Sequence, residues 1–149
     1  MKSLLNPADK EEIVKRLKTL RPDSARQWGK MNAHQGVCHL SDSFRAMMGE
    51  KEVSQTGTIF HRTLVKWLAL YIPAQWPHGV KTRPEVDQEI GGTRPVEFAR
   101  DAEDLETLLQ RFSARATFNR HPTFGVMSES EWQRWGYLHM DHHLRQFGA

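Results

Sequence analysis

The sequence predicts an all-α fold, a four-helix bundle with one additional short helix and one long loop. Four segments carry hydrophobic residues at helical spacing, and typical helix-capping residues stand at several of their starts. No convincing strand pair and no internal repeat is present. The 149 residues are enough for one sizeable core, so we expect a single helical domain over residues 1–149.

The first helix is predicted over residues 6–20. Asn6 is a plausible N-cap, Pro7 suits the first helical position, and Asp9 places negative charge in the first turn. Hydrophobic residues then recur at helical spacing in "IVKRLKTL". Pro22 is expected to end this helix.

The middle of the chain predicts two helices and a loop. The second helix is expected at about residues 30–48, with Gly49 near its end, and a third, apolar helical segment over 57–72. Residues 73–95 contain four prolines and three glycines, so we expect a long loop there. Long loops in small domains are often functional or mobile.

Two further helices complete the predicted bundle. The segment 101–118 is amphipathic, and we expect Asp101 to cap it. Its apolar face comprises Leu105, Leu108, Leu109 and Phe112. The last helix is predicted over 128–148, where Ser128 and Glu131 have capping-box spacing and Gly148 suits the end.

The composition narrows the classes of function. The 21 basic residues are interleaved with 18 acidic ones, so nucleic-acid binding is not expected. No apolar run approaches the roughly 20 residues that span a bilayer, and we expect no membrane association. Cys38 is the only cysteine, which fits a reducing cytoplasm. The oligomeric state stays open, with a homodimer among the alternatives.

The last predicted helix carries a pair of histidines suited to metal binding. On a helical wheel His139 and His143 share one stripe with Trp132 and Trp135, the face expected to be buried. Residues four apart on a helix lie about 5–6 Å apart, so two imidazoles can converge on one ion. The alternative is a chance pair that only forms hydrogen bonds.

His39 is the best candidate for a third ligand. It lies outside the polar arc of the second helix, beside small residues such as Gly36 that leave room for an ion and its waters. Alternatively it is an ordinary core histidine.

The remaining histidines are assigned weaker roles. We expect His34 to be solvated, His61 to lack a clear partner and His78 to line a pocket mouth. His142 either flanks the pair or lies at the solvent edge, and His121 stabilises a turn or serves as a fourth ligand. Asp42 lies on the polar side of its helix. It could orient an imidazole, but a solvated carboxylate is the favoured interpretation.

At these residues the sequence resembles a known family. The segment "WGKMNAHQGVCHLSD", followed near the C-terminus by "HMDHHLRQ", is similar to the DinB/YfiT-like superfamily of four-helix-bundle proteins, which includes metalloenzymes. The "HPTFG" ahead of "EWQRW" resembles a branch of unknown function. The resemblance spans about residues 6–147 and is weakest at 73–95. It implies a metal site formed by His39, His139 and His143.

The function predicted from this site is that of a metal-dependent enzyme. Three neutral nitrogen donors suit Zn²⁺ or Ni²⁺ better than Mg²⁺ or Ca²⁺. Relatives in the superfamily include metal-dependent thiol transferases and isomerases, which implies a small-molecule substrate such as a low-molecular-weight thiol. A hydrolase-like reaction is also open. One alternative is a non-catalytic metal-binding or stress-associated helical protein, and another is a bundle that binds no metal.

Overall fold

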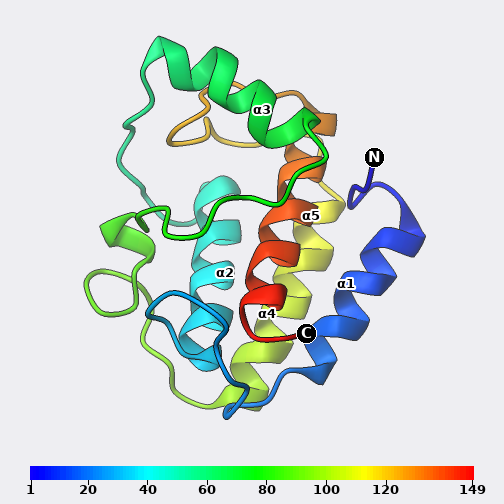
Figure 1. Cartoon of the computed structure of the whole chain (residues 1–149), viewed down its shortest axis with the longest axis vertical. Coiled ribbons are helices and arrows are strands. Elements are labelled where there is room, and N and C mark those ends of the chain that lie inside the picture. The colour runs from blue at the N-terminus through cyan, green and yellow to red at the C-terminus, as the bar shows by residue number, and fades with distance from the viewer.

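A computed structural model describes residues 1–149 and confirms the all-α fold. It contains five α-helices and no β-strand (Figure 1). The four long helices are α1 (Pro7–Thr19), α2 (Ala33–Met47), α4 (Phe98–Ser113) and α5 (Glu129–Gln146). A five-residue π-helical segment, η1 (His61–Val65), leads into the short α3 (Lys66–Tyr71), and η2 (Pro84–Val86) is a single 3₁₀ turn.

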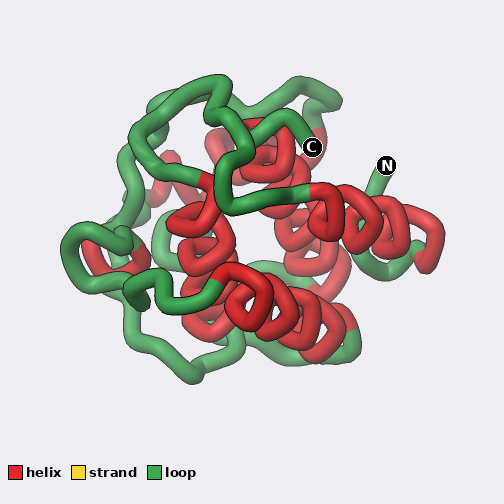
Figure 2. Tube along the Cα trace, turned by 90° about the horizontal axis from the view of Figure 1, so that it is seen from below, coloured by secondary structure: helices red, strands yellow, loops and turns green.

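The four long helices enclose one hydrophobic core. Each of α1 and α2 packs against both α4 and α5, and α3 packs on α5. In Figure 1, α1 and α5 run in one direction and α2 and α4 in the other. Figure 2 shows the helices grouped together with the loops along the outside. This packing places the middle of α2 beside the C-terminal half of α5.

Capping residues define most of the helix starts. The Asn6 side chain accepts the Ala8 N–H, and Ser128 and Glu131 form the predicted capping box. A second capping box, formed by Asn32 and Gln35, starts α2 three residues later than the sequence predicted. Gly148 adopts φ = 74°, the left-handed conformation expected just after a helix end.

The predicted cap of α4 is wrong. The helix begins at Phe98, and the Glu97 carboxylate accepts the first free N–H groups, those of Ala99 and Arg100. Asp101 therefore lies inside the first turn, where its carboxylate accepts the Val96 N–H and turns toward α2. Because Glu97 satisfies the helix start, Asp101 is available for other contacts.

The apolar segment expected over 57–72 is helical over 59–71, with η1 inside it, and it is mostly not buried. Leu70 is its only buried residue from η1 onward, whereas Ile59 is 77% and Trp67 is 49% exposed. Residues 73–95 form the predicted long loop, with η2 as its only helical turn. None of the helices combines the length and apolarity needed to cross a bilayer.

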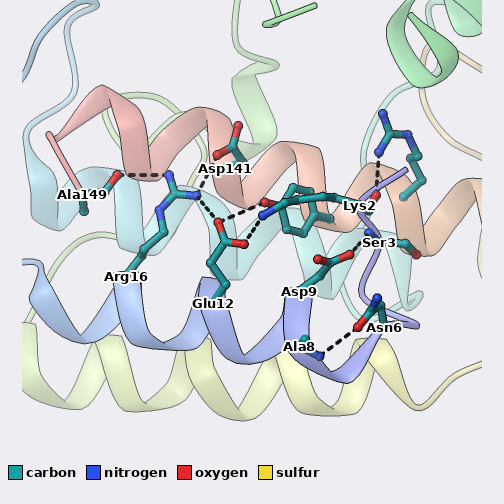
Figure 3. Close-up of polar contacts among 11 residues, drawn as sticks. Lys2, Ser3, Asn6, Ala8, Asp9, Glu12, Arg16, Asp141 and Ala149 are labelled. Atoms are coloured by element: carbon teal, nitrogen blue, oxygen red, sulfur yellow. Dashed lines mark hydrogen bonds and ion pairs between the residues drawn. The ribbon is translucent and has the colours of Figure 1, made fainter. Parts of the chain in front are cut away.

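A polar network fixes the rotation of α5 relative to α1 (Figure 3). Arg16 Nη1 donates to Asp141 Oδ1 at 2.7 Å, and its Nη2 donates to the Ala149 carbonyl at 3.0 Å. Asp141 also accepts from Arg145. Because Asp141 faces α1, the side chains of His139 and His143 face the opposite neighbour, α2.

Substitution of Phe112 tests the packing of the hydrophobic core. The Phe112 ring is fully buried and lies 4.8 Å from the Phe44 ring, centroid to centroid. Phe112→Ala should lower the free energy of unfolding by about 3–5 kcal/mol, because the cavity cannot close completely. Urea denaturation would measure this loss. The matched control is Gln110→Ala on the exposed face of α4, which should change stability by less than about 0.5 kcal/mol.

Candidate metal centre

The structure brings together the three histidines that the sequence selected. His39 comes from α2, and His139 and His143 come from successive turns of α5. The ring centroids are 5.3 Å apart for His39 and His139, 4.7 Å for His39 and His143, and 4.9 Å for His139 and His143. One ring nitrogen from each residue lies within 4.8 Å of the others. The three side chains can therefore reach a common point.

The 73–95 loop fixes the proton position on His39. The Nδ1 of His39 lies 2.8 Å from the carbonyl oxygen of Val86, the last residue of η2. Because a carbonyl only accepts, Nδ1 carries the proton and donates it. The lone pair is therefore on Nε2, the nitrogen that faces the cluster, as is usual for histidines that ligate metals.

Gln146 fixes the proton position on His143 in the same way. The His143 Nδ1 lies 2.8 Å from Gln146 Oε1, and the Gln146 amide donates in turn to the Trp28 carbonyl at 3.0 Å. That second bond identifies Oε1 as the acceptor, so Nδ1 of His143 is the donor. The His143 lone pair is on Nε2 as well.

His139 completes the cluster without a comparable support. Its Nε2 lies 3.3 Å from Nε2 of His39, while its Nδ1 is buried and has no hydrogen-bond partner. Two nitrogens bound at 2.0–2.1 Å to one tetrahedral ion would be about 3.3 Å apart. The 3.3 Å between the two Nε2 atoms therefore fits two ligands of one ion. The contacts within the cluster leave the buried Nδ1 of His139 without a hydrogen-bond partner.

Burial keeps the three imidazoles neutral. It is the main cause that lowers the pKa of His39 and places the pKa values of His139 and His143 well below the usual 6.5. The His143 and His39 rings further lower the pKa of His139, and the His39 ring that of His143, since two imidazolium charges at this distance repel. Neutral imidazole is the form that binds metal ions.

The expectation that Asp42 is a solvated carboxylate is wrong. Asp42 is fully buried. Its carboxylate accepts the Thr93 N–H and hydroxyl, both at 2.7 Å, and the Gln88 amide at 3.3 Å. Lys51 Nζ lies 3.3 Å away and offsets the charge. Asp42 contacts no imidazole, but it fixes the loop that supplies Val86 to His39.

Aromatic side chains surround His139 and its neighbour His142. Trp132 and Trp135 are buried as predicted, and the Trp135 ring lies 4.7 Å from that of His139. Trp76, from the long loop, lies 6.2 Å from both His139 and His142. The cluster is therefore lined by aromatic side chains from α5 and from this loop.

The space expected beside Gly36 is not available to an ion. A Cβ built on Gly36 would meet Phe147 Cε2 at 2.3 Å, so the phenylalanine ring occupies that space. The small residue instead permits the C-terminal turn to pack closely on α2. This contact holds the end of α5, with His143 and Gln146, against the helix that carries His39.

The other histidines lie outside the cluster. His121 stabilises a turn, because its Nδ1 accepts the N–H groups of Thr123 and Phe124. His78 stacks on Trp28 at 3.8 Å, and His61 contacts the Thr58 hydroxyl. The expectation for His34 is wrong, since its side chain is only 18% exposed and its Nε2 lies 2.7 Å from Asp101.

His142 flanks the cluster as predicted, with its ring centroid 5.1 Å from that of His143. Its Nδ1 is buried and has no hydrogen-bond partner. Burial, followed by the nearby Arg145, lowers the pKa of His142 to about 4.

The supporting contacts of Val86 and Gln146 were not among the sequence-based expectations. Gln146 lies three residues after His143 on the same stripe, so helical spacing could have suggested the contact. Val86 gave no such signal, because it contacts His39 through its backbone from a distant loop.

Fold and cluster together define a helical protein with a buried three-histidine site. The family model for a protein of unknown function, DUF1569, matches residues 2–149, and the chain therefore belongs to that family. No curated protein and no solved structure matches the chain.

Asp42→Ala should lower the free energy of unfolding by about 2–4 kcal/mol, since the Thr93 and Gln88 donors lose their buried acceptor. Amide hydrogen exchange should also become faster at Thr93. Asp104→Ala, at an exposed position on α4, is the control and should change neither quantity appreciably. Unchanged exchange at Thr93 in Asp42→Ala would show that the loop does not depend on this carboxylate.

His121 predicts a dependence of stability on pH. Burial lowers its pKa to about 3, so below pH 6.5 the unfolded chain takes up a proton that the folded chain does not. Stability is therefore complete above pH 6.5 and is lost as the pH falls toward 3. His121→Asn keeps an acceptor for the turn but removes this titration.

The pH dependence of His121→Asn should be shallower than that of the wild type by up to about 1.4 kcal/mol per pH unit below 6.5. Urea denaturation with a chelator present, at a series of pH values from 7 to 5, would measure both slopes. Parallel curves would contradict the assignment, even if the variant is less stable at every pH.

Proposed function

We propose that the protein is a DinB-like metalloprotein that binds a divalent ion through His39, His139 and His143. The observation that carries this proposal is the orientation of the rings. Val86 and Gln146 hold protons on the Nδ1 atoms of His39 and His143, which leaves both Nε2 lone pairs toward the cluster. The 3.3 Å separation of the His39 and His139 Nε2 atoms suits a shared ion.

Zn²⁺ and Ni²⁺ are the ions that this donor set fits best. Three neutral nitrogens are poor ligands for Mg²⁺ or Ca²⁺, which prefer oxygen. His121 and His78 make other contacts, so the cluster comprises three protein ligands. A three-ligand site leaves a position for water or substrate, whereas structural zinc sites usually have four protein ligands.

We propose an enzymatic role that uses this open position. A bound divalent ion would supply Lewis acidity and stabilise a thiolate or hydroxide in the site. The chain's own residues orient the ligands and line the site with the aromatic rings of Trp76 and Trp135. We propose a low-molecular-weight thiol as the substrate class, on the basis of the resemblance to DinB-like thiol transferases. A hydrolytic reaction is the alternative at the same site.

A second candidate function is a non-catalytic metal protein. His39 and His143 are buried, and the cluster joins α2 to α5. An ion there would crosslink two helices that are far apart in sequence and stabilise the fold. This function predicts a large rise in melting temperature with metal and no thiol-dependent turnover.

Single substitutions separate ligands from neighbours. His39→Ala, His139→Ala and His143→Ala should each weaken Zn²⁺ binding at the three-histidine site by at least about 100-fold, since two imidazoles hold a metal ion poorly. His142→Ala is the matched control and should keep most of the affinity. His142 lies about 100° from His143 around the helix. Isothermal titration at pH 7, with circular dichroism as a fold check, would measure this.

Loss of Zn²⁺ binding in His142→Ala together with its retention in His139→Ala would overturn the ligand assignment. Activity is tested separately. The Zn²⁺-loaded and Ni²⁺-loaded proteins are screened for transfer of small thiols to electrophiles and for ester and amide hydrolysis. Turnover that is lost with a chelator and in His139→Ala supports an enzyme, and its absence with metal bound favours the non-catalytic role.

A further inference from the structure

A second group of metal-ligating side chains lies near the start of α2. His34 and Cys38 project from α2, and Asp101 projects from the first turn of α4. They offer a nitrogen, a sulfur and a carboxylate oxygen within 4.8 Å of one another. His34 Nε2 lies 2.7 Å from Asp101 Oδ2, and Cys38 Sγ lies 3.7 Å from the same oxygen. Three different ligand types thus converge from two packed helices.

We propose that His34, Cys38 and Asp101 form a second binding site for a divalent cation that accepts sulfur ligands, with Zn²⁺ as the best fit. His34 and Cys38 are four residues apart and share one face of α2. Cys38 and His39 are consecutive, so they point about 100° apart around the helix axis. The two clusters therefore face different neighbours of α2, and neither site needs the other.

The existing contacts suit replacement of protons by a cation. Asp101 Oδ2 accepts from the Cys38 thiol and from the Val96 N–H, and it pairs with His34. A cation at the centre of the three groups would take the place of the protons that now join them. The thiol proton would leave to solvent, and His34 would bind as neutral imidazole. No oxidant or reductant is required.

Burial opposes deprotonation of the Cys38 thiol, so only a cation with high affinity for sulfur can bind here. Access from solvent is open on the other side of the cluster. The Cys38 thiol is buried, and burial followed by the nearby Asp101 raises its pKa to about 12. A thiol in these surroundings stays protonated at neutral pH, whereas a coordinated cation deprotonates it. The His34 and Asp101 side chains are 18% and 20% exposed, so an ion can enter from solvent on their side.

The ligand types indicate which cation would bind. A thiolate combined with imidazole and carboxylate favours zinc over magnesium or calcium. Zinc is bound at about 2.3 Å by sulfur and about 2.0–2.2 Å by nitrogen or oxygen, so the His34 nitrogen and Asp101 oxygen must separate by about 0.6 Å. Rotation of these partly exposed side chains provides that movement. The fourth position would hold water.

Cobalt(II) titration tests this site directly, because a thiolate bound to Co²⁺ gives an intense near-ultraviolet charge-transfer band. Cys38 is the only cysteine, so the band reports on this site alone. Full-length wild-type protein should develop the band and bind about two equivalents of Co²⁺, one for each cluster. Absence of the band at saturating Co²⁺ would overturn the inference without any variant.

Substitutions then identify the ligands. Cys38→Ser should lose the band and about one equivalent of Co²⁺. Asp101→Asn should weaken binding at this site by at least about tenfold, because a charged ligand is replaced by a neutral amide. Asp104→Asn, on the exposed side of the same helix, is the matched control and should change nothing. Full stoichiometry in Cys38→Ser, or unchanged affinity in Asp101→Asn, would overturn the ligand assignment.

The result can be separated from that of the three-histidine site. In His139→Ala the band should remain while the equivalent bound without thiolate is lost. A band in a protein that binds no metal through its histidines would reject only the proposed function. Co²⁺ binding without a band would reject only the second site. Zinc competition gives an independent readout, since Zn²⁺ should displace the bound Co²⁺ and abolish the thiolate band.

Discussion

The hydrogen bonds of the buried Asp42 carboxylate are the interactions on which the three-histidine site depends. An ionised group inside a helical core is costly unless donors surround it, and Asp42 obtains them from Thr93, Gln88 and Lys51. These partners belong to segments that have no helical structure to hold them. Their bonds to Asp42 fix the loop on α2. That loop then presents the Val86 carbonyl to His39. By fixing the loop, the Asp42 carboxylate therefore helps to place the proton on Nδ1 of His39.

The opposite side of the cluster is held by a different means. Gln146 bonds both to His143 and to the Trp28 carbonyl, and the Phe147 ring packs onto Gly36. The C-terminal turn is therefore attached to α2 by close packing and to the 20–32 connection by hydrogen bonds. As a result α2 and α5 are held in contact. The Nδ1 atoms of His39 and His143 each point toward a fixed acceptor. Such supporting contacts are what orient ligands in metal sites generally.

Helix α2 unites the two clusters. Along one short segment it presents Cys38 toward α4, His39 toward α5 and Asp42 toward the long loop. This explains why a helix with so many polar residues is almost entirely buried. Cys38, His39 and Asp42 each bond to a different neighbour of α2, and the helix therefore supports both clusters. Only His139 and His142 retain a buried ring nitrogen without a hydrogen-bond partner.

The sequence alone determined the features that depend on local spacing. The helical periods, the caps at Asn6 and Ser128, and the pairing of His139 with His143 all follow from residues within one or two turns of each other. His39 was also found, because its position on the wheel departs from the polar arc. The tertiary structure decided the burial of Asp42, the contacts of Asp101, the exposure of the apolar 57–72 segment and the role of Val86. Each of these depends on which remote segment covers a given helix face, and a helical wheel cannot supply that information. A polar arc is solvated only if nothing with complementary donors packs against it.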